Sequence, residues 1–188
     1  MVLMSRIELL DDETAPIPVK QFFADGDPGP IVAALANVPE MVGPTLGFIG
    51  AALGAGSTGV RAKEFAILRT SALQSCQYCI NAHTTVALDV GLASDEVKAL
   101  RGELELELAF TEEADLALIA WIDANAGATG PIADEIYDRA NKHWDEHSLI
   151  ELSITIGATL FLNRFATGFE LPTSPEVFAR LAAEGLSS

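Results

Sequence analysis

Apolar residues along most of the chain recur at intervals of three and four positions, which is the spacing of one face of an α-helix. This pattern predicts helices over 30–53 (with a break), 60–73, 79–90, 94–100, 111–127, 131–144 and 149–165. The last of these is nearly uncharged, which is typical of a helix buried in a core. Alternation of apolar and polar residues is scarce, so no strand is predicted. The sequence therefore predicts one all-α domain over 1–188.

Residues that start and stop helices agree with this pattern. Pro39 and Pro44 predict the break within 30–53. Ser94 has the position of an N-cap, and the two acidic residues after it suit the positive end of a helix. Gly91 is well placed to end the preceding helix. Four prolines near the beginning (Pro16, Pro18, Pro28 and Pro30) predict an extended N-terminal arm or loop over 1–28.

A shift of 87 residues along the sequence aligns similar residues of its two halves. It places Glu64 on Glu151 and Ile67 on Ile154, which is a hint of an internal duplication. The same shift places Asn163, Ala166 and Glu170 where Cys76, Cys79 and His83 stand. If the halves are related, only the first half keeps the chemically reactive side chains.

The net charge narrows the classes of partner. The chain has 11 basic and 27 acidic residues, a formal net charge of −16. Such a surface repels phosphate backbones and anionic lipid, so binding to nucleic acid or to a membrane surface is not expected. No apolar run approaches the roughly 18–20 residues that cross a bilayer. The first residues, MVLMSRIELLDDE, lack the layout of a secretory signal, so a cytoplasmic protein is expected.

The candidate chemistry lies in one short segment. Cys76, Cys79 and His83 are spaced so that they share one face of a helix. The first turn of a helix and a nearby imidazole both lower the pKa of a thiol, and the thiolate is the reactive form. Because His83 is four residues from Cys79 and seven from Cys76, we expect Cys79 to be the more acidic thiol. Oxidation should join the two cysteines in a disulfide.

Glu64 lies twelve residues before Cys76, on a helix face that looks buried. A buried acid needs a partner, and a pairing with His83 would form a proton relay to the thiols. Simpler interpretations exist for each residue alone. Glu64 can be a surface ion-pair partner of Lys63, the cysteines can be small core residues, and a lone histidine is often structural.

Taken together, these residues carry a family resemblance. The segment RAKEFAILRTSALQSCQYCINAH resembles the E-x11-C-x-x-C-x-x-x-H signature of alkylhydroperoxidase D-like proteins in the carboxymuconolactone decarboxylase superfamily. The similarity extends to most of the chain, including the segment Asn163-Arg164-Phe165-Ala166, which is similar to the peroxidase-related subgroup. The resemblance implies an all-α fold of two related helical halves that forms a homo-oligomer.

The resemblance also implies roles for the site residues. Cys79 would be the peroxidatic thiolate, Cys76 the resolving thiol, His83 the base and Glu64 the outer end of the relay. Tyr78 departs from the pattern, since the best-known members carry a second histidine there. Tyrosine donates a hydrogen bond but cannot accept a proton near neutral pH, so the relay would be shorter.

The expected activity is therefore the reduction of hydroperoxides by the dithiol, without a bound cofactor or metal, as in antioxidant defence. A lipoyl group or a thioredoxin-like protein would reopen the disulfide. Three alternatives remain open at this point: a zinc site built from the same four residues, a non-catalytic oligomeric protein, and a lactone decarboxylase-like enzyme. Two long, nearly uncharged segments, 39–56 and 149–162, also predict self-association.

Overall fold

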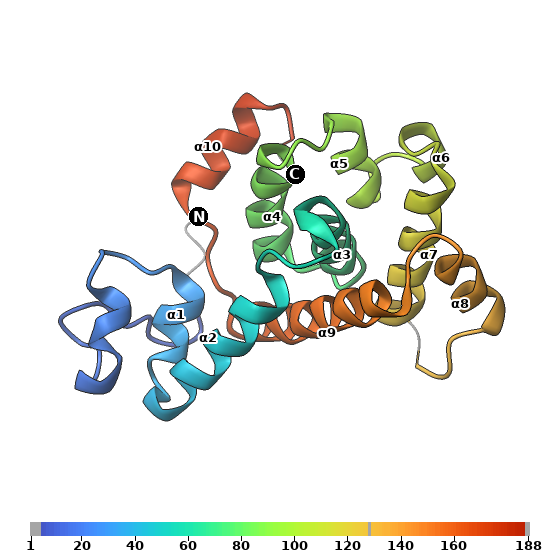
Figure 1. Ribbon diagram of the computed structural model, residues 1–188. Helices are drawn as coiled ribbons and strands as arrows, with labels where there is room; N and C mark the ends of the chain where they lie inside the picture. Colours follow the sequence, from blue (N-terminus) through green and yellow to red (C-terminus); the bar gives the residue numbers. More distant parts are fainter. Residues whose placement is uncertain (1–4, 128, 187–188) are drawn as a thin grey trace.

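The computed structural model describes residues 5–127 and 129–186 (Figure 1). Within them the chain is helical and contains no strand, so the predicted all-α fold is confirmed. The elements are η1 (Ile17–Phe23), α1 (Pro30–Leu35), α2 (Pro39–Leu53), α3 (Gly59–Leu73), α4 (Gln77–Asp89), α5 (Ser94–Leu100), α6 (Leu106–Ala109), α7 (Glu113–Gly127), α8 (Asp134–Asn141), α9 (Glu146–Phe169) and α10 (Pro175–Ala183). Most predicted helices are present, and their ends differ by a few residues.

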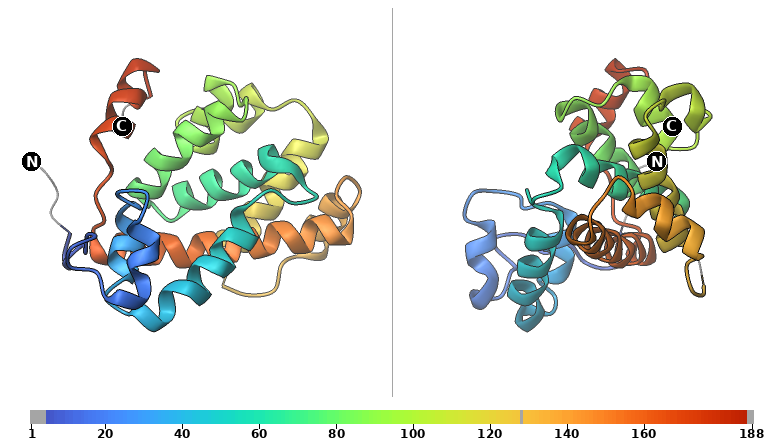
Figure 2. Two further views of the ribbon diagram at one scale, coloured as in Figure 1. Left: turned by 60° about the vertical axis from the view of Figure 1, so that its left-hand side comes forward. Right: turned by 45° about the vertical axis from the view of Figure 1, so that its right-hand side comes forward.

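The long helix α9 is the centre of the packing. It runs beneath α3 and crosses α2 and α7 (Figures 1 and 2), and it contacts α2, α3, α4, α7 and α8. Asp145 begins the helix as its N-cap, since its side chain accepts a hydrogen bond from the amide of Ser148 at 2.8 Å. By length and composition α9 could cross a membrane, since an 18-residue window of this helix has a mean hydropathy of 1.3. Its buried residues, such as Leu152 and Ile156, pack instead in the main hydrophobic core.

The N-terminal segment is folded against the rest of the protein where the sequence predicts an extended arm. Val19 and Phe23 of η1 are buried, and they pack with Leu35 and Val42 of the next two helices. Residues 1–4 of the predicted arm lie outside the described residues. The apolar residues of η1 thus build a small second core.

The two predicted helix breaks have different outcomes. Pro39 opens α2, where a proline is tolerated because the first amides of a helix have no partner. Pro44 does not break the chain but lies inside α2. It is exposed, so a backbone carbonyl that loses its partner there can be hydrated.

The turn between α3 and α4 positions the cysteines. Ser75 takes a positive φ of 53°, which reverses the chain within three residues. The amide of Cys76 then donates to the carbonyl of Ser71 at 3.0 Å, and Gln74 donates to the carbonyl of Ala126 at 3.0 Å. The turn is therefore fixed both to α3 and to α7. At the positions related by the sequence shift, α9 continues without a turn.

Candidate functional site

The two cysteines face each other at the start of α4. Cys76 precedes the first helical residue, Cys79 lies three residues later, and their Sγ atoms are 2.8 Å apart as free thiols. They are only 1% and 5% exposed, and they share an apolar cluster with Ala34, Ala166 and Leu171. The pair is therefore shielded from water and close enough for the two sulfurs to share a proton.

The surroundings separate the acidities of the two thiols. The pKa of Cys76 is lowered to about 6, first by the hydrogen bond from the Cys79 thiol and also by the Cys79 amide, Thr167 and the charge of His83. The pKa of Cys79 is raised because its proton is held in that hydrogen bond and because it is buried. The directions of these two shifts oppose the expectation that Cys79 is the more acidic thiol. The neighbouring thiol and the helix start outweigh the proximity of His83.

Glu64 and His83 form the second pair of the site. Nδ1 of His83 lies 3.0 Å from Oε2 of Glu64, which reaches it from α3. The side chain of Glu64 is buried, and that of His83 is 23% exposed. Glu64 is thus not a surface partner of Lys63, whose ammonium group pairs with Glu151 instead. His83 is hydrogen-bonded to Glu64, and its influence on Cys76 is electrostatic.

The helix α9 contributes polar residues to the site that sequence reasoning did not assign. Asn163 is 1% exposed, donates to the hydroxyl of Ser71 at 3.0 Å, and counteracts the rise in the pKa of Cys79 through a hydrogen bond. Its Oδ1 atom has no hydrogen-bond partner among the described residues. Thr167, one turn further along α9, contacts Cys76. Two signals in the sequence pointed to Asn163, the shift that placed it on Cys76 and the family resemblance of the segment 163–166, but neither assigned it a role.

The four predicted residues do not converge on a metal position. They form two pairs, the thiols and the Glu64–His83 contact. Within residues 5–127 and 129–186, no group of three or more His, Cys, Asp or Glu residues is arranged to hold a metal ion. The zinc alternative therefore has no ligand set in the described part of the chain.

A groove of about 1150 Å³ lies next to the thiol pair. Its walls come from the N-terminal segment, the start of α1, the start of α4 and the segment that joins α9 to α10, which lie together in Figure 2. Tyr78 lines this groove and also belongs to the apolar cluster around the cysteines. Burial, together with the negative charge of Cys79, Cys76 and Asp27, raises the pKa of Tyr78 to about 12. Tyr78 therefore stays protonated and neutral.

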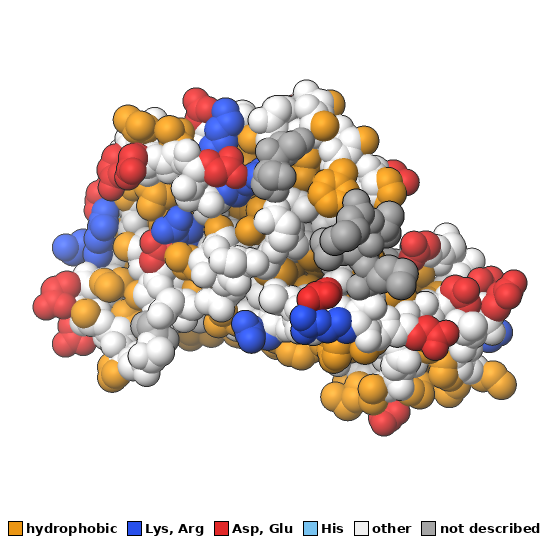
Figure 3. All heavy atoms as spheres, turned by 180° about the vertical axis from the view of Figure 1, so that it is seen from behind, with side chains coloured by type: hydrophobic (Ala, Val, Ile, Leu, Met, Phe, Trp, Pro, Cys, Tyr) orange, Lys and Arg blue, Asp and Glu red, His pale blue; other side chains and the backbone are white. Residues whose placement is uncertain are grey.

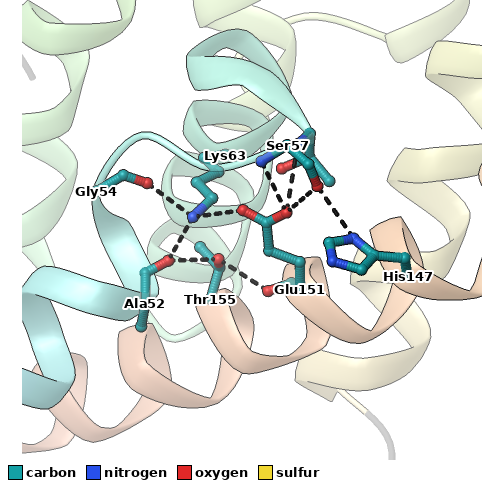
Figure 4. A network of polar contacts seen from close by, with 8 residues as sticks. Ala52, Gly54, Ser57, Lys63, His147, Glu151 and Thr155 are labelled. Atoms are coloured by element: carbon teal, nitrogen blue, oxygen red, sulfur yellow. Dashed lines mark hydrogen bonds and ion pairs between the residues drawn. The ribbon is translucent and has the colours of Figure 1, made fainter.

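A second polar cluster joins α3 to α9 and to the loop between α2 and α3 (Figure 4). The buried ammonium group of Lys63 contacts the carbonyls of Ala52 and Gly54, at 3.0 and 2.7 Å, and Glu151 at 2.9 Å. Glu151 also accepts a 2.6 Å hydrogen bond from the hydroxyl of Ser57. A Cβ at Gly56 would collide with the Glu151 carboxylate, so a larger residue there would displace this carboxylate from its partners.

His147 completes this cluster but does not make it a catalytic triad. Its Nδ1 lies 3.0 Å from the hydroxyl of Ser57, and Glu151 contacts the same hydroxyl. In a hydrolytic triad the carboxylate orients the histidine, whereas here it bonds to the serine directly (Figure 4). The cluster ties the loop between α2 and α3 to α9.

Comparison with known proteins finds matches to part of the chain. Residues 39–123 match the model of the carboxymuconolactone decarboxylase family. Over 105 residues the chain is 29% identical to the uncharacterized protein YdfG of Bacillus subtilis (strain 168), covering 55% of this chain and 70% of that protein.

Solved structures with the same fold cover nearly the whole chain. An alkylhydroperoxidase AhpD core, an uncharacterized peroxidase-related protein from Ralstonia eutropha JMP134, has a TM-score of 0.80 at 15% identity, covering 93% of this chain and 94% of that one. The debrominase Bmp8, as its C82A variant in complex with 2,3,4-tribromopyrrole, has a TM-score of 0.76 at 17% identity, covering 97% and 99%. At these identities the likeness establishes the fold.

Proposed function

Because residues 39–123 match the model of the carboxymuconolactone decarboxylase family and the chain has an alkylhydroperoxidase D-like fold, we propose that it is a dithiol-dependent peroxidase. The observation that carries this proposal is the buried pair of free thiols at 2.8 Å, with the pKa of Cys76 lowered to about 6. A thiol with this pKa is mostly thiolate at neutral pH, and the thiolate is the nucleophile in peroxide reduction.

The proposed reaction has three balanced steps. The thiolate of Cys76 attacks the terminal oxygen of ROOH, the O–O bond breaks, and the alkoxide takes a proton and leaves as ROH. The sulfenic acid on Cys76 then reacts with the thiol of Cys79, which forms the disulfide and releases water. An external dithiol, such as a lipoyl group or a thioredoxin-like protein, reduces the disulfide by thiol exchange and is itself oxidised.

The acidities exchange the roles that the family resemblance implies for the two cysteines. In the proposal Cys76 attacks, because it holds the thiolate, and Cys79 resolves the sulfenic acid. His83 and Glu64 hold and move the proton that the leaving oxygen needs. Asn163 is a positioning residue, since it fixes the Cys79 side chain from α9.

The direct test is peroxide consumption by the reduced protein with a dithiol donor. After one equivalent of peroxide, mass spectrometry should show the loss of two hydrogens within the segment that holds Cys76 and Cys79. Brief alkylation of the wild-type protein at a series of pH values, followed by peptide mapping, then identifies the nucleophile. We expect the label on Cys76, with a midpoint near pH 6, because the Cys79 thiol stabilises the Cys76 thiolate only in the intact pair. Thiols that stay reduced with every peroxide and donor contradict the proposal.

We further propose that the protein is a cytoplasmic homo-oligomer. Large apolar side chains that are about half exposed lie on α2 (Met41, Phe48) and on α9 (Ile150, Ile154, Phe161). Figure 3 shows hydrophobic side chains gathered at the lower right, over η1, α1 and α2, and along the lower edge. Burial of this surface between copies would remove an unusually apolar patch from water. Light scattering at low micromolar concentration tests it, and a monomeric mass contradicts it.

A second candidate function is the reductive removal of a halogen from an aromatic ring. It is favoured by the apolar groove beside the thiols and by the fold shared with a debrominase. The thiolate and the thiol together would supply two electrons and one proton. The carbon–bromine bond breaks, the ring carbon takes the proton, bromide leaves, and the cysteines form a disulfide. Bromide release from 2,3,4-tribromopyrrole, measured beside peroxide consumption, separates the two activities.

A further inference from the structure

The groove and the thiol pair share an apolar wall. Leu9, Tyr78 and Leu171 line the groove, and all three belong to the apolar cluster that holds the cysteines. Cys76 and Cys79 themselves are 1% and 5% exposed and do not line the groove. A molecule in the groove would therefore contact side chains that also pack around the two cysteines.

The lining of the groove has a definite chemistry. Most of it is apolar, with Leu9, Leu10, Phe23, Pro28, Pro30, Ala33, Leu171, Pro172 and Phe178 among its residues. Its charged residues are Asp11, Asp12 and Asp27, all exposed, and none of the described lining residues is Lys or Arg. Three carboxylates on one apolar groove of a protein with a net charge of −16 repel anions from its mouth.

We propose that this groove is the entrance to the thiol pair, that it admits organic molecules without negative charge, and that the ring of Tyr78 closes its inner end. The inference rests on the proposed peroxidase function, for which it names the substrate class. That class is uncharged organic hydroperoxides, and it leaves out hydroperoxides that carry a carboxylate. The size of the groove suits a molecule well beyond hydrogen peroxide.

The aspartates differ in what else they do. Asp11 accepts hydrogen bonds from the amides of Glu13 and Thr14, and Asp27 accepts one from the amide of Gly29. Both therefore hold the backbone of their loops. Asp12 has no hydrogen bond among the described residues and is exposed, so Asp12→Asn removes charge from the rim with little effect on structure.

Alkylation of the reduced protein tests the entrance without any peroxide. Iodoacetamide is neutral and iodoacetate is an anion of nearly the same size. The rate ratio of the two reagents on the chain unfolded in urea gives the intrinsic preference of the thiols. In the folded protein at low salt, we expect the ratio of the iodoacetamide rate to the iodoacetate rate to be about tenfold larger than in the unfolded chain. At high salt this difference should be smaller. Asp12→Asn should narrow the difference.

Three variants locate the route. Ala24 is exposed and lines the groove, so Ala24→Trp should slow alkylation by iodoacetamide severalfold. Leu108→Trp is the matched control, because Leu108 lies on α6, is 72% exposed and is not part of the groove. Tyr78→Ala should accelerate alkylation, whereas Tyr78→Phe should keep the wild-type rate because it retains the ring.

The outcomes separate the inference from the proposed function. An unchanged rate in Ala24→Trp, or no penalty for iodoacetate, overturns the entrance. The proposed entrance is also overturned if the alkylation rate falls as the protein concentration rises, because a second copy of the chain would then cover the groove. For the substrate class, the probes are linoleic acid hydroperoxide and its methyl ester, with the ester expected to react faster. Equal rates or faster reaction of the acid contradict the inference alone, and inert thiols with both contradict the peroxidase proposal.

Discussion

Two neighbouring residues of α3 enter two different polar clusters, and the contrast explains which cluster can do chemistry. Lys63 reaches the carboxylate of Glu151 on α9, while Glu64 reaches the ring of His83 on α4. Both carboxylates lie on helices that pack against each other. They differ in their partners, and the partner determines whether a proton can move.

The carboxylate of Glu151 is fixed in its charged form. Hydrogen bonds from Lys63 and Ser57 lower its pKa to about 2, so it does not titrate at physiological pH. Glu64 has the imidazole of His83 as its partner instead, and an imidazole has one nitrogen that can donate a hydrogen and one that can accept a hydrogen. We infer that the first cluster holds the fold together and the second serves the reaction. Variants in the two clusters should therefore affect different measurements.

The largest effect is expected at the thiols themselves. Cys76→Ser and Cys79→Ser should each lower peroxide turnover by about a thousandfold or more, roughly 4 kcal/mol of activation free energy, because neither can close the disulfide. The melting temperature should stay near that of wild type, since serine is nearly the same size. Substantial dithiol-dependent turnover in either variant would show that the pair is not the catalytic unit.

The second effect is on stability. Lys63→Met leaves the Glu151 carboxylate without its cation in a mostly buried place, so the free energy of unfolding should fall by about 3 kcal/mol. Urea unfolding measures this loss. Turnover per folded molecule should remain close to that of wild type. If Lys63→Met is as stable as wild type but has lost turnover, Lys63 takes part in the reaction, and the assignment of a structural role to its cluster is wrong.

The third effect is on the reaction. Glu64→Gln keeps the shape of the side chain but removes the proton acceptor behind His83, so turnover at neutral pH should fall by about 30-fold, roughly 2 kcal/mol. Glu107→Gln, an exposed change on α6, is the matched control. The pH–rate profile should also change shape in Glu64→Gln alone. A lower melting temperature with unchanged turnover would make Glu64 a structural residue.

Much of the architecture and of the site could be predicted because its signals are local. The helical spacing of apolar residues predicted the elements, and one continuous segment holds Glu64, Cys76, Cys79 and His83. The contacts from α9 could not be predicted in the same way. Asn163 contacts Cys79 only after the chain has folded, and no local spacing in the sequence predicts this contact.

The same reasoning explains why one alternative, the pairing of Glu64 with Lys63, fails and why the expected order of the thiol acidities is not found. Lys63 was the nearest cation in sequence to Glu64, yet consecutive residues of a helix diverge and each finds its partner on another helix. The acidity of the thiols was expected to follow the distance to His83. It follows instead the hydrogen bond between the two sulfurs, which depends on the turn at Ser75.

The smallest effect concerns acid, and it follows from the pKa of Glu151. The folded state lowers this pKa from its ordinary value of 4.5 to about 2, so the carboxylate stabilises the fold above pH 4.5, and this contribution is lost as pH falls toward 2. The side chain is 17% exposed, so solvent reduces the contribution to about 1 kcal/mol. The gap in unfolding free energy between wild type and Glu151→Gln should therefore be larger at pH 6 than at pH 3. If this difference in unfolding free energy does not change with pH, Glu151 acts through its shape and hydrogen bonds rather than its charge. The contrast in charge between Glu151 and Glu64 would then be removed, and only their different positions would distinguish them.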